Sequence, residues 1–207
     1  MFRYNPDNFI MVLLSKAGSI MLTELMWAVL CMPVITIGAS TTAMCTIMWR
    51  IKRKEDVCII REFWAVFRRE WRDATRAWLI FLALGIVLLL DIFACFQMHG
   101  SAFIVTFMKW STILFGLLYI MVFHWLFAGI AKYKATTKEA ICNAFFWVAV
   151  NWKQTLLMTC LTISNVIAIA LLEWIAVPLI GFNSYLQNSM IDKIYCVSKK
   201  EKVVEGI

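Results

Sequence analysis

The fold class is decided by one uninterrupted apolar stretch, which reads Trp78-Leu-Ile-Phe-Leu-Ala-Leu-Gly-Ile-Val-Leu-Leu-Leu-Asp-Ile-Phe-Ala-Cys-Phe96. Its only charged residue is Asp91, which lies near the far end. A helix needs about 20 predominantly apolar residues to cross the hydrocarbon core of a bilayer. The stretch therefore predicts a transmembrane helix.

Three further regions are apolar enough to enter a bilayer: residues 20–49, 110–131 and 155–177. The whole chain is 62% hydrophobic and 16% charged, whereas a soluble domain is about half apolar and about a quarter charged. We expect an all-α, multi-pass membrane protein with four long hydrophobic regions. Residues 1–207 would form a single membrane domain.

Residues 20–49 are interrupted by Pro33 and Gly38. Proline ends or kinks a helix because it has no amide donor and clashes with the preceding turn. We expect one helix over residues 8–32, a turn at Pro33–Gly38, and a second helix over residues 39–54 that runs back. The C-terminal region repeats this design, so a similar break is expected at Pro178–Gly181. The total would be six helices. The alternative is that residues 20–49 cross once, which places the N-terminus outside.

Lysine and arginine are enriched on the cytoplasmic side of membrane proteins. Residues 50–76 carry nine of them, and further lysines lie around residues 132–153 and 193–202. Residues 97–109 carry one lysine and no acid. The expected orientation is cytoplasmic for the basic segments and both termini, and external for residues 97–109.

Residues 55–77 form the expected basic, amphipathic, interfacial segment. At helical spacing an aromatic and apolar face is opposed by an arginine face. The aromatic and apolar face carries Phe63, Phe67, Trp71, Ala74 and Trp78, and the arginine face carries Arg61, Arg68, Arg72 and Arg76. These arginines can contact anionic lipids or a protein partner, or they can act only as an anchor that sets the topology. No basic groove with interleaved aromatic residues is present, so nucleic-acid binding is not expected.

A run of small residues, Gly38-Ala-Ser-Thr-Thr-Ala43, opens the second helix. Small residues let helices approach closely. Ser40, Thr41 and Thr42 are expected to cap the amides freed by the break. Alternatively, the helix N-terminus could attract an anionic group.

The longer stretch Pro33-Val-Ile-Thr-Ile-Gly-Ala-Ser-Thr-Thr-Ala43 resembles the signature of the YesL-like family of bacterial membrane proteins of unknown function. The resemblance continues through the arginine segment with Phe63 and Phe67 to Trp78. It implies a multi-pass helical protein of the bacterial plasma membrane. It also implies an accessory or regulatory role linked to carbohydrate uptake, in a transporter complex or a homo-oligomer. The family supplies no catalytic residues to carry over.

Four ionisable residues fall within the expected spans, where such residues are costly and often functional. Asp91 and Glu173 are expected near the outer ends, in contact with water. Glu24 is expected in the interface or facing Lys16. His124 is expected to hydrogen-bond a neighbouring helix, and neither metal nor cofactor binding is predicted.

No sequence motif of a hydrolase, metalloprotease or nucleotide-binding enzyme occurs, so an enzyme is not expected. A small transporter or channel subunit remains the alternative function. Such a protein should carry polar groups between its helices.

Overall fold

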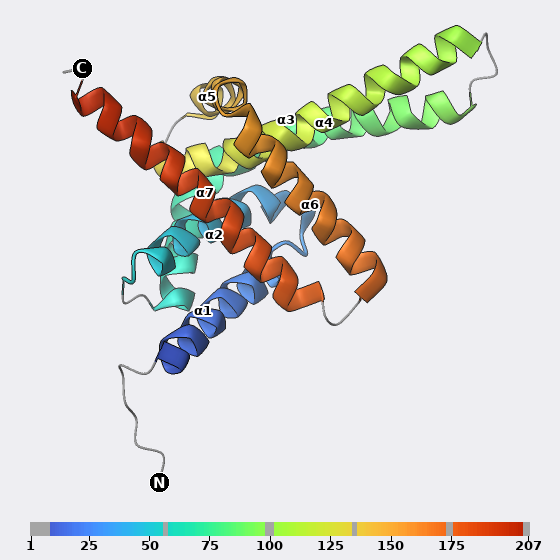
Figure 1. The fold of residues 1–207 in the computed structure, drawn as a ribbon. Coiled ribbons are helices and arrows are strands. Elements are labelled where there is room, and N and C mark those ends of the chain that lie inside the picture. Colours follow the sequence, from blue (N-terminus) through green and yellow to red (C-terminus); the bar gives the residue numbers. More distant parts are fainter. Residues whose placement is uncertain (1–8, 56–57, 98–101, 134–135, 173–175, 205–207) are drawn as a thin grey trace.

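The computed structural model describes residues 9–55, 58–97, 102–133, 136–172 and 176–204. All regular elements among these residues are helical, and none is a strand (Figure 1). The seven α-helices are α1 (Phe9–Leu30), α2 (Ile37–Lys52), α3 (Ile59–Gln97), α4 (Ala102–Tyr133), α5 (Thr137–Val150), α6 (Trp152–Leu172) and α7 (Ala176–Val204). The expected number was six. Helix α5 is the additional one, because its 14 residues are too few to register as a membrane span.

The first break lies where Pro33 predicts it, although its bounds differ. Helix α1 ends at Leu30, a short 3-10 helix covers Val34–Thr36, and α2 begins at Ile37. The Thr36 hydroxyl bonds to the carbonyls of Leu30 and Pro33, which joins the two sides of the break. Gly38 therefore lies in the first turn of α2.

The expected break at Pro178–Gly181 is wrong. Helix α7 begins at Ala176 and runs through both residues to Val204. Proline is tolerated in the first turn of a helix because the amide it lacks would have no intrahelical partner there. Pro178 therefore lies inside the start of a helix instead of interrupting one.

The expected interfacial segment and the first expected span form one helix, α3, of 39 residues. At 1.5 Å per residue it is roughly 58 Å long, about twice the thickness of a bilayer core. We call residues 59–77 the body half and residues 78–97 the arm half. In the body half, Phe63, Val66, Phe67 and Ala74 are buried in a core shared with α2.

Helix α2 runs along the body half. Gly38 at its start contacts the Ala74 carbonyl and the Trp78 side chain, and a Cβ on Gly38 would lie 2.5 Å from that oxygen. Further along, Met48 and Ile51 share the core with Phe63. The small-residue run thus provides the close helix approach that the sequence predicts.

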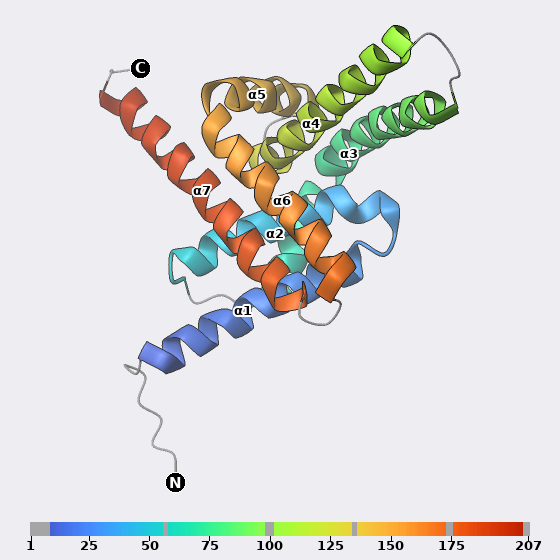
Figure 2. The ribbon, with the colours of Figure 1, turned by 45° about the vertical axis from the view of Figure 1, so that its right-hand side comes forward.

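The arm half pairs with residues 102–121 of α4, and the two form a hairpin that extends away from the other helices (Figures 1 and 2). Tyr119 packs against Phe81 and Gly85. The outer surface is apolar, and Val87, Leu89 and Phe107 are each at least 60% exposed. We call this hairpin the arm.

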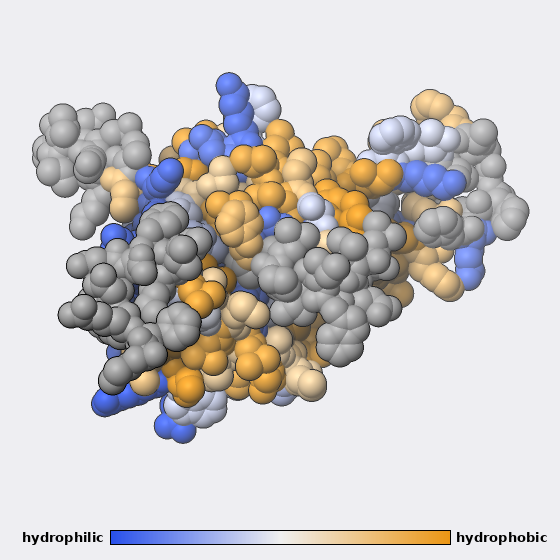
Figure 3. All heavy atoms as spheres, turned by 60° about the horizontal axis from the view of Figure 1, so that its bottom comes forward, coloured by the Kyte–Doolittle hydropathy of each residue, from blue (hydrophilic) through white to orange (hydrophobic). Residues whose placement is uncertain are grey.

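Three helical segments within the described residues are long and apolar enough to cross a membrane: Val34–Lys52, Ile59–Cys95 and Thr106–Tyr133. The expected number of such regions was four, and residues 155–177 do not supply one among the described residues. The last two segments contain most of the arm. Most of the first is buried inside the protein. Figure 3 shows a face with a broad apolar surface and hydrophilic side chains gathered at its edges.

Candidate functional site

The arginine face of the body half is exposed. Arg61, Arg68, Arg72 and Arg76 all point away from the core that holds Phe63 and Phe67. Within the described residues, only Arg76 among the four has a carboxylate partner, Asp73 at 4.0 Å. The face therefore carries positive charge that the described carboxylates leave largely unneutralised.

Aromatic rings lie between the arginines and line a shallow groove with them, an arrangement that the sequence analysis did not predict. Its lining residues are Trp64, Phe67, Arg68, Arg69, Trp71 and Arg72. Trp64 stacks on Phe67 with ring centroids 5.4 Å apart, and the Arg68 guanidinium lies 5.0 Å from the Trp64 ring.

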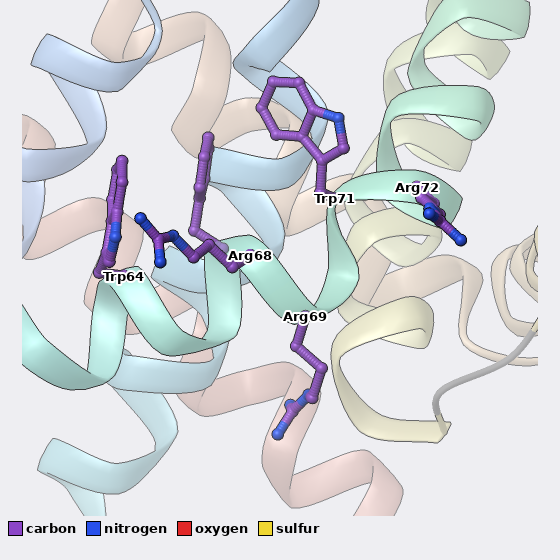
Figure 4. A pocket seen from close by; sticks show the side chains of 6 residues that line it. Trp64, Arg68, Arg69, Trp71 and Arg72 are labelled. Atoms are coloured by element: carbon purple, nitrogen blue, oxygen red, sulfur yellow. The ribbon is translucent and has the colours of Figure 1, made fainter.

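The guanidinium groups of this groove do not converge. Figure 4 shows the side chains of Arg68, Arg69 and Arg72 pointing in different directions. Arg69 is also paired with Glu70 at 2.6 Å. A small anion held by several arginines needs their donors aimed at one point. The arrangement instead suits many separate contacts with an extended anionic surface.

A second charged cluster joins α2, α4 and α7. The Asp192 carboxylate accepts hydrogen bonds from Lys52 at 3.1 Å, Arg53 at 3.0 Å and Lys132 at 3.1 Å. Lys132 also lies over the ring of Trp49. The sequence predicts that these three basic regions lie on one side of the membrane, and the structure brings them to one carboxylate.

Asp192 is only 4% exposed. Burial alone would raise the pKa of its carboxyl, but the hydrogen bonds from Lys52, Lys132 and Arg53 outweigh burial and hold the pKa below its ordinary value. The charged Asp192 carboxylate therefore connects three helices. Periodicity could not identify it, because its partners lie far away in the sequence.

The expected capping role of Ser40, Thr41 and Thr42 is wrong. The Thr41 and Thr42 hydroxyls donate to the carbonyls of Ile37 and Gly38, four residues back. Because α2 starts three residues before Ser40, these side chains lie too far into the helix to cap it. Thr41 also accepts a bond from the Trp27 indole at 3.2 Å. The first turn of α2 packs against α3, which closes that side to an anionic ligand.

Glu24 is buried within the protein, and among the described residues Lys16 is not its partner. The polar group beside its carboxyl is Ser184 on α7, whereas Lys16 lies 4.8 Å from the ring of Tyr185. One Glu24 oxygen, Oε1, and the Ser40 hydroxyl are buried without a hydrogen-bond partner.

Asp91 bonds to the Thr112 hydroxyl across the two helices of the arm. The sequence places Asp91 near water but gives no indication of this partner. Glu173 lies outside the described residues.

His124 contacts the neighbouring helix α6, as expected. Its Nε2 lies 2.7 Å from the Thr162 hydroxyl, and Gln187 on α7 bonds to the same hydroxyl at 3.2 Å. Asn183 and Asn165 form a second polar contact between α7 and α6. Thr162 and Gln187 were missed because neither is ionisable. Thr162 is one of several polar residues within the mostly apolar α6, and Gln187 lies among other polar residues of α7, so neither stands out in the sequence.

The family comparison matches residues 20–92, and the matching family is described as "Protein of unknown function, DUF624". The YesL-like proteins belong to this family. The match covers α2, its break from α1, and α3 almost to its end. No curated protein and no solved structure matches the chain. The part of the chain that resembles a known family thus carries both the arginine face and most of the arm half.

Proposed function

We propose that this chain is a multi-pass membrane protein whose arm crosses the bilayer and whose arginine face lies on anionic lipid headgroups. The observation that carries the proposal is the change along α3. Exposed arginines occupy the body half and end at Arg76, and a series of exposed leucines, isoleucines and valines begins at Leu79. Among the described residues of the body half, Ile60 alone of these three residue types is exposed.

The energetic argument is the same for both halves. An arginine at the centre of a membrane helix costs about 2.5–3.5 kcal/mol, so the body half does not lie in hydrocarbon. Each fully buried aliphatic side chain gains about 1.5–3 kcal/mol on leaving water, so the arm half does not remain in water. The membrane boundary therefore falls near Trp78, where the first pattern gives way to the second.

Helix α2 packs along the body half of α3, so both lie at the same depth relative to the membrane. Its apolar side chains are covered by protein, so their hydrophobicity needs no lipid to explain it. In this arrangement α2 lies at the membrane surface beside the arginine face, although its length and composition alone would permit a crossing.

The charge distribution supports a cytoplasmic position for the arginine face, the Asp192 cluster and both termini. Residues 97–109 contain the outer end of the arm, and the loop between its two helices would be external. The resemblance to YesL-like proteins supports the bacterial plasma membrane. It also supports an accessory or regulatory role, linked to carbohydrate uptake, in a transporter complex or a homo-oligomer. The arginine face would hold the protein's cytoplasmic surface against the membrane while such a partner binds.

The test replaces Arg61, Arg68, Arg72 and Arg76 with glutamine and measures the preference for anionic lipid in nanodiscs of mixed composition. Each arginine near such a surface contributes about 1 kcal/mol, so the preference for anionic lipid should fall strongly. The matched control removes four exposed lysines, Lys54, Lys138, Lys153 and Lys193, and should have a smaller effect. Equal losses in both variants would contradict a specific role for the arginine face.

A small transporter or channel subunit is the second candidate. The observation that favours it is the set of polar groups between helices, namely the His124, Thr162 and Gln187 contacts and the unpartnered Glu24 and Ser40 oxygens. Flux assays in proteoliposomes would test the transporter candidate. Unchanged flux after removal of these polar groups would count against it.

A further inference from the structure

Three side chains from three helices meet between α4, α6 and α7. His124 lies on α4, Thr162 on α6 and Gln187 on α7, and each is partly buried. Among the described residues, no charged side chain forms a hydrogen bond or ion pair with His124. Its surroundings are the Phe123 ring, the Thr162 hydroxyl and the Ile120 carbonyl.

The hydrogen-bond partners determine which imidazole nitrogen carries the proton. His124 Nδ1 lies 2.7 Å from the Ile120 carbonyl oxygen, and a carbonyl can only accept. Nδ1 therefore carries a hydrogen in both the neutral and the charged ring. In the neutral ring, Nε2 must then accept a hydrogen bond from the Thr162 hydroxyl at 2.7 Å.

The Thr162 hydroxyl has a second acceptor within reach, the Met158 carbonyl at 3.0 Å. If Nε2 takes up a proton, it donates to Thr162, and the Thr162 hydrogen rotates to the Met158 carbonyl. The Gln187 amide donates to Thr162 at 3.2 Å and to Met158 at 3.3 Å, and neither of these bonds depends on the charge of His124. Both protonation states are satisfied without movement of a heavy atom.

We propose that His124, Thr162 and Gln187 form a proton-binding site between α4, α6 and α7. The proton binds at His124 Nε2, and the Thr162 hydroxyl changes from donor to acceptor. Gln187 holds that hydroxyl in place for both states. The site deepens the transporter candidate, because titratable groups between membrane helices commonly carry protons.

The test is nitrogen-15 NMR of histidine-labelled protein in lipid bilayers, over a pH series from 4 to 9. The chain has two histidines, so replacing His99 leaves a single signal from His124. The neutral ring should have its proton on Nδ1, and the signal should change to that of imidazolium as the pH falls. A neutral ring protonated on Nε2, or no titration in this range, would overturn the proposal.

A positioning role makes a further prediction for Thr162→Val, which keeps the shape of the side chain but removes its hydrogen bond to Nε2 in both states. The bond to the charged ring is the stronger of the two, so the charged ring loses more. The midpoint of the titration should fall by about one pH unit, and Thr162→Ser should restore it. An unchanged midpoint in the valine variant would contradict the site. These outcomes do not depend on flux, so the proton site and the transporter candidate can fail separately.

Discussion

The two halves of α3 have the same secondary structure but differ in how far their apolar side chains are buried by the protein. In the body half, Phe63 is fully buried against α2, and the arginines lie on the opposite face. In the arm half, Val87 is 60% and Leu90 63% exposed, although α4 packs alongside. The protein core covers the apolar side chains of the body half, whereas those of the arm half would be covered only by a hydrophobic solvent. The place where α3 changes from one pattern to the other is therefore the strongest support for the proposed membrane boundary.

The largest expected effect concerns the ion cluster that holds the helices beside the body half. Asp192→Asn leaves three cations around a buried site without a carboxylate, which should reduce the free energy of unfolding by about 3–5 kcal/mol. Chemical unfolding in detergent would measure it. Asp73→Asn is the control, because its pair with Arg76 is 4.0 Å long and largely exposed, and it should change little. Similar losses in both variants would show that the cluster does not hold the body together.

The same carboxylate predicts a pH dependence. The pKa of Asp192 is lower in the folded protein than its ordinary value, so its stabilising effect is fully present above about pH 4. The effect is lost as the pH falls through the folded pKa. In Asp192→Asn this part of the acid sensitivity should be absent, which unfolding measurements between pH 2.5 and 6 would detect. Parallel curves for the two proteins would contradict the assignment.

The next prediction compares a substitution to arginine at one exposed position in each half of α3. Val87→Arg places a cation on the exposed surface of the arm and should cost about 2.5–3.5 kcal/mol of membrane insertion. Ala65→Arg adds the same charge to an exposed position of the body half and should be nearly neutral. The fraction of each variant inserted into the membrane would measure both. Equal insertion would remove the distinction between the halves.

A smaller effect is expected from glycine substitutions. Gly38→Ala brings a Cβ within 2.5 Å of the Ala74 carbonyl and should destabilise the contact of α2 with the body half by about 1–3 kcal/mol. Gly116 on the arm has no neighbour within 4 Å of such an atom, so Gly116→Ala should be neutral or slightly stabilising. Thermal unfolding would compare them. An equally tolerant Gly38 would mean that α2 and α3 are less closely packed than the structure shows.

The sequence predicts those features that depend on local periodicity or on a single residue. The apolar and arginine faces of the body half follow from 3.6-residue spacing, and the break before α2 follows from Pro33. The break assigned to Pro178 fails because a proline pattern alone does not distinguish a helix interior from a first turn. The capping prediction for Ser40 fails because α2 starts at Ile37, two residues earlier than expected and three residues before Ser40.

Other features depend on tertiary contacts and could not be predicted from one sequence. Asp192 meets Arg53 from 139 positions away, and no local pattern encodes that pairing. Thr162 and Gln187 become significant only when α6 and α7 bring them to His124. Helix α5 is a different case: it was missed because it is too short to span a membrane, although the capping box of Thr136 and Glu139 is a local signal that could have identified its start.

The central claim, that the membrane boundary crosses α3 near Trp78, is tested most directly by depth measurement with nitroxide labels. One label replaces Arg72 in the body half and another replaces Val87 in the arm half, both at exposed positions. Position 87 is nine residues past the boundary, or about 13 Å along the helix, and should be close to the centre of the bilayer. The label at 87 should therefore be relaxed by oxygen, and the label at 72 by a water-soluble nickel complex. Equal depth for the two labels, or a deeper label at 72, would contradict the account.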